Sequence, residues 1–127
     1  MAKLLAIDGL NIVRRVYEAS PEPDSDLKAS IALRHAFSSF RKVLDTHAPT
    51  HVLAAFDHGG DNWRHALYPR YREGRAAMPH ELRAALPEFH ERLRAAGLHV
   101  VSIPEVEADD VIATGVMRWL SDRKSVV

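Results

Sequence analysis

The chain has 127 residues, of which 17 are basic and 17 acidic, so its formal net charge at pH 7 is zero. This length suffices for one domain with a single core, and the balanced charge excludes a uniformly basic nucleic-acid binder. The absence of cysteine excludes disulfides and thiolate metal sites. Apolar runs are strand-sized and the N-terminus lacks a signal-peptide pattern, so we expect a cytoplasmic protein without membrane segments.

The first predicted element is a short strand. Residues Lys3–Ile7 form a continuously apolar run that suits a strand buried on both faces. Asp8 and Gly9 follow at its carboxyl end. A helix is predicted over Asn11–Ala19, and the prolines and capping residues of Ser20–Asp26 predict a loop.

A second helix and a second strand come next. Apolar residues spaced by four, three and four predict one face of an amphipathic helix over Leu27–His47. A second buried-type strand, His51–Phe56, ends at Asp57, so the pattern of an apolar strand followed by aspartate occurs twice. The apolar residues of the helix are Leu33, Phe37, Phe40 and Leu44.

The middle of the chain is basic and aromatic. After a glycine-containing turn over 58–62, the segment Trp63–Arg75 holds four arginines and three aromatic residues against a single acid. Pro69 and Gly74 argue against one long helix there.

The last third of the chain alternates again between helix and strand. A helix is predicted over His80–Ala96, where Pro87 interrupts the pattern, and a third strand over Leu98–Ile103. A helix over Ala108–Ser121 follows. Residues 124–127 predict the start of a fourth strand.

This order of elements predicts an α/β protein with a mostly parallel central sheet and right-handed crossovers. In open sheets of this kind, ligands bind beyond the carboxyl ends of the strands. The residues directly after each predicted strand are therefore the first candidates for a functional site.

Carboxylates follow all three complete strands. Asp8 and Asp57 follow the first two, and the acidic cluster Glu105–Asp110 follows the third. Acidic residues at such positions commonly cap turns or complement a helix dipole. Their expected convergence at one sheet edge instead favours a metal site, and oxygen ligands alone favour Mg²⁺ or Mn²⁺. Such a site suits phosphoryl transfer.

The eight histidines do not change this interpretation. None has HExxH spacing, since His80-Glu81 lacks the second histidine. A zinc hydrolase is therefore disfavoured.

The basic segment Trp63–Arg75 supplies a complement to the acidic edge. Arginine forks match phosphate oxygens, and aromatic faces stack on the bases of a single strand. The alternative is a solvated loop whose aromatic residues are pinned to the core. Together with a metal edge, the segment points to a nuclease.

Five motifs stand out along the chain, namely Ile7-Asp8-Gly9-Leu10-Asn11 with Arg15, Ala55-Phe56-Asp57, Trp63-Arg64-His65, Tyr71-Arg72-Glu73-Gly74-Arg75 and Glu107-Ala108-Asp109-Asp110-Val111. Together they resemble the bacterial 5′-nuclease family, which includes the 5′-3′ exonuclease domain of DNA polymerase I and the stand-alone flap endonucleases. The stand-alone type is the closer match, and the resemblance runs over essentially the whole chain. It implies a three-layer PIN-like, resolvase-like fold and metal-dependent hydrolysis of phosphodiester bonds in branched or 5′-ended DNA, with two Mg²⁺ or Mn²⁺ ions in the complete protein.

The resemblance also implies roles for individual residues. Arg15 matches a basic residue near the scissile phosphate, and Arg72 stands where the family usually has a lysine. That difference keeps the charge but replaces an ammonium with a planar fork. Arg64, Tyr71 and Arg75 match DNA-contacting positions near the helical arch. The carboxylates that match metal ligands are Asp8, Asp57, Glu107, Asp109 and Asp110, whereas Glu105 is expected to face solvent.

Two family features are missing from residues 1–127, namely a strand with a T-x-D-x-D motif and a helix-hairpin-helix module. We therefore expect an N-terminal catalytic half whose sheet is truncated at the fourth strand, with a partial metal site and weak or no activity alone. Two other hypotheses remain open. One is a nucleic-acid-binding or interaction module of the same fold that cannot cut. The other is a PIN-type ribonuclease acting on single-stranded RNA.

Overall fold

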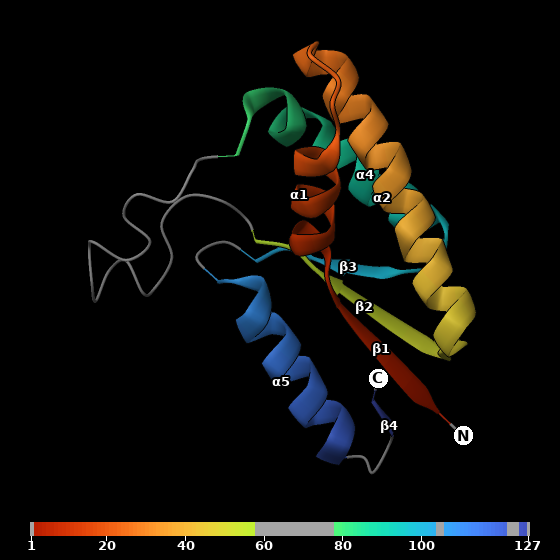
Figure 1. The fold of residues 1–127 in the computed structure, drawn as a ribbon. Coiled ribbons are helices and arrows are strands. Elements are labelled where there is room, and N and C mark those ends of the chain that lie inside the picture. Colours follow the sequence, from red (N-terminus) through yellow and green to blue (C-terminus); the bar gives the residue numbers. More distant parts are fainter. Residues whose placement is uncertain (1, 58–77, 104–105, 122–124, 127) are drawn as a thin grey trace.

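A computed structural model describes residues 2–57, 78–103, 106–121 and 125–126. Figure 1 shows the order of the elements along the chain. None of the helices in these ranges is both long enough and apolar enough to cross a membrane. The elements are β1 (Lys3–Asp8), α1 (Gly9–Ala19), α2 (Ser25–His47), β2 (His51–Ala55), α4 (His80–Ala95), β3 (His99–Val101), α5 (Ala108–Ser121) and β4 (Ser125–Val126).

The described strands form one parallel sheet in the order β3-β2-β1-β4. In the central pair, Leu4 lies opposite His51 and Asp8 opposite Ala55. Because the strands are parallel, β1, β2 and β3 end at the same edge. The predicted parallel sheet is confirmed, and the predicted fourth strand is present as β4, which pairs with β1.

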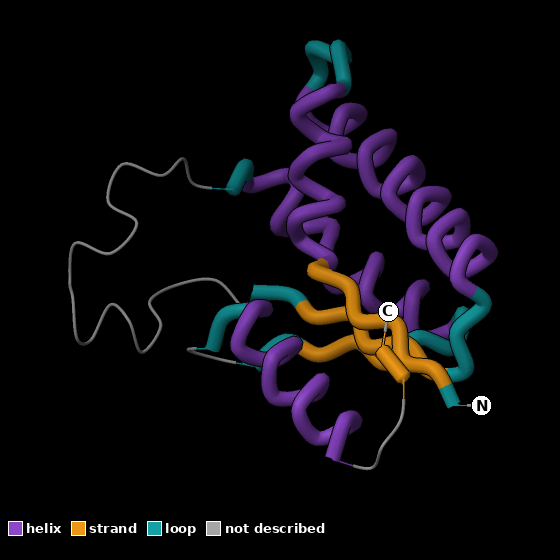
Figure 2. The backbone as a smooth tube through the Cα atoms, turned by 60° about the horizontal axis from the view of Figure 1, so that its bottom comes forward, coloured by secondary structure: helices purple, strands orange, loops and turns teal. Residues whose placement is uncertain are grey.

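The described helices lie in two layers on opposite faces of the sheet. Helices α1, α2 and α4 pack together on one face, whereas α5 lies on the other against β1 and β2 (Figures 1 and 2). The fold is therefore the predicted three-layer arrangement, with the sheet in the middle.

The core lies between the sheet and the three-helix layer. The Phe89 ring meets the rings of Phe40 and Phe56 edge-on, at centroid distances of 5.9 Å and 6.4 Å. All three rings are almost fully buried. The predicted apolar face of α4 is confirmed, because Leu82, Leu86, Phe89 and Leu93 are buried. The helix continues through exposed Pro87.

Aspartates determine where two helices begin. Asp24 accepts a hydrogen bond from the Leu27 backbone nitrogen at 2.9 Å, so α2 begins at Ser25 rather than at Leu27 as predicted. Asp8 caps α1 in the same way, and that helix begins directly after β1. An added Cβ at Gly9 would lie 2.3 Å from the Phe56 ring. The missing side chain lets the ring pack beneath the first turn of α1, which holds the end of β2 close to this corner.

A candidate metal and phosphate site

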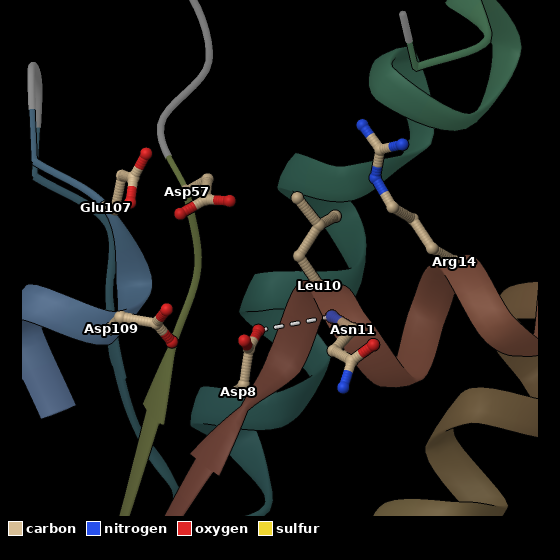
Figure 3. A pocket seen from close by; sticks show the side chains of 7 residues that line it. All are labelled: Asp8, Leu10, Asn11, Arg14, Asp57, Glu107 and Asp109. Carbon is tan, nitrogen blue, oxygen red and sulfur yellow. Dashed lines mark hydrogen bonds between the residues drawn. The ribbon is translucent and has the colours of Figure 1, made fainter. Parts of the chain in front are cut away.

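An acidic pocket of about 180 Å³ lies at the carboxyl edge of the sheet. Its lining comes from the β1–α1 corner, the end of β2 and the start of α5, as Figure 3 shows. Convergence of the strand-end carboxylates at one edge is thus observed. The lining residues are Asp8, Leu10, Asn11, Arg14, Asp57, Glu107 and Asp109.

Asp8 is held in the pocket by the turn from β1 into α1. It is the last residue of the strand, and its Oδ1 accepts a hydrogen bond from the Asn11 backbone nitrogen at 3.2 Å. Sequence reasoning placed Asp8 here but did not include Asn11 or Leu10 in the site. Asn11 could have been found from its spacing, because it is the third residue after the capping residue Asp8.

Asp57 connects two elements that are far apart in sequence. Its Oδ1 accepts a hydrogen bond of 2.6 Å from the backbone nitrogen of Ala108, the first residue of α5. The carboxylate therefore satisfies a free N–H of the helix and places negative charge at its positive end. Through this bond, the end of β2 determines where the acidic start of α5 lies.

Glu107 and Asp109 approach the pocket from the start of α5. The Glu107 carbonyl accepts hydrogen bonds from the backbone nitrogens of Asp110 and Val111, which closes the first turn of the helix. Glu107 is only 5% exposed, whereas Asp109 is exposed. In Figure 3, Glu107 and Asp109 lie on one side of the end of β2, which carries Asp57, and Asp8 lies on the other side.

Asp110 does not join this pocket. It lines a separate, mainly apolar groove between α5 and the sheet, together with Val52, His99 and Trp119. Successive residues of an α-helix are rotated by about 100°, so neighbours in sequence point in different directions. The structure therefore separates Asp110 from the other four predicted metal ligands.

The two arginines of α1 also face different environments. Arg15 is exposed and lines a concavity with Val16, Pro21 and His35, away from the acidic pocket. Arg14 lines the acidic pocket instead. Sequence reasoning selected Arg15. Helical spacing was the signal for Arg14, which lies four residues after Leu10 and three after Asn11 on the same side of the helix.

The remaining predicted site residues lie outside the described ranges. These are the DNA-contacting candidates of the basic segment, Arg64, Tyr71, Arg72 and Arg75. Glu105, which was expected to face solvent and not to join the site, also lies outside the described ranges.

The donor set of the pocket fits a hard divalent cation. Four carboxylates supply oxygen ligands of the type that Mg²⁺ and Mn²⁺ prefer, and the pocket contains no histidine. Within the described residues, however, no three acidic or histidine side chains are grouped closely enough to hold a metal ion. To bind a metal ion, the carboxylates would have to turn toward a common point.

A partly buried histidine of α4 lies close to the end of β2. The His90 ring contacts the ring of Phe56, the residue before Asp57, at a centroid distance of 4.3 Å. Burial lowers the pKa of His90, Arg94 lowers it further by charge repulsion, and Glu91 opposes the shift. The His90 Nε2 atom is buried without a hydrogen-bond partner in the described part of the chain.

Comparison with known proteins places this architecture in a family. Residues 3–127 match the family described as 5′-3′ exonuclease, N-terminal resolvase-like domain. The chain belongs to this family. Its similarity to curated relatives agrees with that assignment. The chain is 41% identical over 114 residues to the flap endonuclease Xni of Shewanella denitrificans. It is also 34% identical over 115 residues to that of Psychromonas ingrahamii.

The 5′-3′ exonuclease domain described here is shorter than those relatives. The matches cover 90% and 89% of this chain but 44% of either relative, so the chain spans less than half of their length.

Known structures show the same fold. A bacteriophage T5 5′-exonuclease with bound zinc matches 94% of this chain and 45% of its own, with a TM-score of 0.61 at 21% identity. A bacteriophage T5 flap endonuclease in complex with DNA and metal ions matches 96% of this chain and 46% of its own, with a TM-score of 0.58 at 21% identity.

Proposed function

We propose that this chain is the catalytic part of a 5′ nuclease that hydrolyses phosphodiester bonds with Mg²⁺ or Mn²⁺. The observation that carries the proposal is the convergence in one pocket of carboxylates from the end of β1, the end of β2 and the start of α5. Family membership and the metal and DNA complexes of proteins with the same fold support it. The similarity to flap endonucleases favours DNA with a 5′ flap or a free 5′ end as the substrate.

In this proposal, Asp8, Asp57, Glu107 and Asp109 hold the metal. Asp110 is left out of the ligand set because it lines a different groove. A bound divalent ion lowers the pKa of a water molecule and stabilises the leaving oxygen. The fold holds the carboxylates in position. The bond from Ala108 to Asp57 keeps the α5 carboxylates at the end of β2, and Arg64, Tyr71, Arg72 and Arg75 are assigned to contacts with the DNA strand.

The proposal is tested by cleavage of a 5′-flap DNA with enzyme in excess, in Mg²⁺ and in Mn²⁺, by this chain and by the full-length protein. The test variants are Asp8→Asn and Asp57→Asn, which remove charge but keep an oxygen that can accept the capping hydrogen bonds. Each should reduce the cleavage rate by more than about 100-fold, because even indirect changes near a metal cost roughly 10- to 100-fold. Asp45→Asn, an exposed carboxylate of α2 outside the pocket, is the matched control.

Three outcomes would count against the proposal. Equal cutting by the wild type and Asp57→Asn would remove the metal assignment. Cleavage of RNA but not DNA would favour a PIN-type ribonuclease. Flap binding without cleavage in either metal by the full-length protein would favour an interaction module of the same fold.

A further inference from the structure

The two faces of the sheet are covered unequally in the described part of the chain. Helices α1, α2 and α4 pack on one face, whereas α5 alone packs on the other, mainly against β1, β2 and β4 (Figures 1 and 2). Parallel sheets occur almost only with helices over both faces, because their strands are apolar on both sides. A single helix leaves part of the second face without this cover.

The uncovered part is the mainly apolar groove of about 820 Å³ between α5 and the sheet. Leu53 of β2, a strand with neighbours on both sides, lines the groove and is only partly buried. His99 of β3 also lines it and is exposed, and Ile103 is 43% exposed. A concave apolar surface of this size is typical of a binding site rather than of ordinary protein exterior.

The exposed side of α5 is apolar as well. After Asp110, Arg118 is the only charged residue of this helix, and Met117 and Leu120 are 72% and 53% exposed. Four large hydrophobic residues are exposed in the described ranges, and three of them, Ile103, Met117 and Leu120, lie on the α5 face of the sheet. A helix with so few charged residues is typical of a protein interior.

We propose that this surface, the groove together with Met117 and Leu120, is the docking site for a helix from the part of the full-length protein outside residues 1–127. The length of the relatives supports this occupant. This chain corresponds to 44% of the Xni relatives, so a full-length protein of their size has more than half of its residues elsewhere. A helix of the same polypeptide is present at a high effective concentration, which a second copy or a separate partner lacks. The docked helix also holds α5, whose start lines the acidic pocket.

Photo-cross-linking in the full-length protein tests the proposal. The photoreactive residue p-benzoylphenylalanine replaces Thr114, an exposed residue of α5 that lines the groove. Peptide mass spectrometry should find it cross-linked to residues outside 1–127 of the same molecule, with a yield independent of protein concentration. The control replaces Leu27, which is 47% exposed on α2, and should give no such cross-link. Cross-links from position 114 to a second copy, or none at all, would overturn the proposal.

Thermal unfolding of the full-length protein gives a second test, with Thr114→Glu compared with Ser38→Glu. Both residues are exposed within helices, but only Thr114 lines the groove. A docked helix would bury the new carboxylate of Thr114→Glu, so its melting temperature should fall by roughly 5 °C or more. Ser38→Glu should stay within about 2 °C of the wild type. Equal small changes in the two variants would overturn the proposal. If Thr114→Glu does not fold, the cross-links from position 114 decide.

Discussion

Asp57 serves the fold as well as the pocket, and substitutions can separate the two roles. Its Oδ1 accepts a hydrogen bond from the first backbone nitrogen of α5. Asp57→Ala removes that acceptor, so we expect the free energy of unfolding to fall by about 1 kcal/mol, as for the loss of a helix cap. Asp57→Asn retains an oxygen acceptor and should cost less.

Urea unfolding of both variants measures this difference. The matched control is Asp45→Ala, which removes an exposed carboxylate with no cap role at the start of a helix. A loss for Asp57→Asn as large as that for Asp57→Ala would contradict the cap, because charge rather than hydrogen bonding would then stabilise α5. If Asp57→Asn costs less stability, it is the better variant for testing metal binding, because it removes the charge and leaves the helix cap in place.

His90 should make stability depend on pH. Its pKa in the folded protein is lowered from 6.5, chiefly by burial. Below pH 6.5 the unfolded chain therefore binds more protons at this residue than the folded chain does. Its contribution to stability is complete above pH 6.5 and is lost as pH falls from there through the folded pKa. The free energy of unfolding should thus be lower at pH 5 than at pH 7.

The variant His90→Leu tests this dependence, with His35→Leu at an exposed position as the matched control. Urea unfolding at pH 5 and pH 7 should show a smaller difference between the two pH values for His90→Leu than for the wild type. The control should keep most of the wild-type difference. An unchanged difference in His90→Leu would assign the pH dependence to other groups.

At the scale of elements, apolar spacing predicted most helices because each helix buries one face against the core. The apolar spacing in α2 and α4 placed Phe40 and Phe89 on the buried faces of these helices, and their rings are in contact in the core. The starts of the helices were less predictable. The capping aspartates Asp8 and Asp24 set them two residues earlier than apolar spacing indicated.

Pro87 lies inside α4 on its exposed side, where it cannot donate a helix hydrogen bond. Because the helix continues through it and its side chain is not part of the core, Pro87→Ala should stabilise the protein. We expect the free energy of unfolding to rise by roughly 1 to 3 kcal/mol, up to the difference in helix propensity between alanine and proline. Chemical denaturation measures this, with Glu88→Ala at the adjacent exposed position as the control. A decrease in stability would show that the proline ring supports the packing of α4.

At the scale of the whole molecule, the sheet topology explains why the meeting of these carboxylates in one pocket was predictable. In a parallel sheet, residues after successive strands share one edge, so Asp8, Asp57 and Glu107 could be brought together without knowledge of any contact. The order of strands and helices does not determine which side of a helix each residue faces. Asp109 and Asp110, like Arg14 and Arg15, are neighbours in sequence that face different pockets. That separation depends on how α1 and α5 pack against the sheet.

Metal binding at this shared edge should stabilise the entire fold, because the proposed ligands come from three separate segments that unfolding disperses. At a free Mg²⁺ or Mn²⁺ concentration 100 times the dissociation constant, the gain is about 2.7 kcal/mol. For a chain of this size, such a gain raises the melting temperature by roughly 8 to 14 °C. Scanning calorimetry with and without metal, followed by chelation, measures the shift. It should be reversible in the wild type and in Asp45→Asn, and strongly reduced in Asp8→Asn and Asp57→Asn. An equal shift in all four proteins would place the bound metal elsewhere, because only these two substitutions remove charge from the acidic pocket.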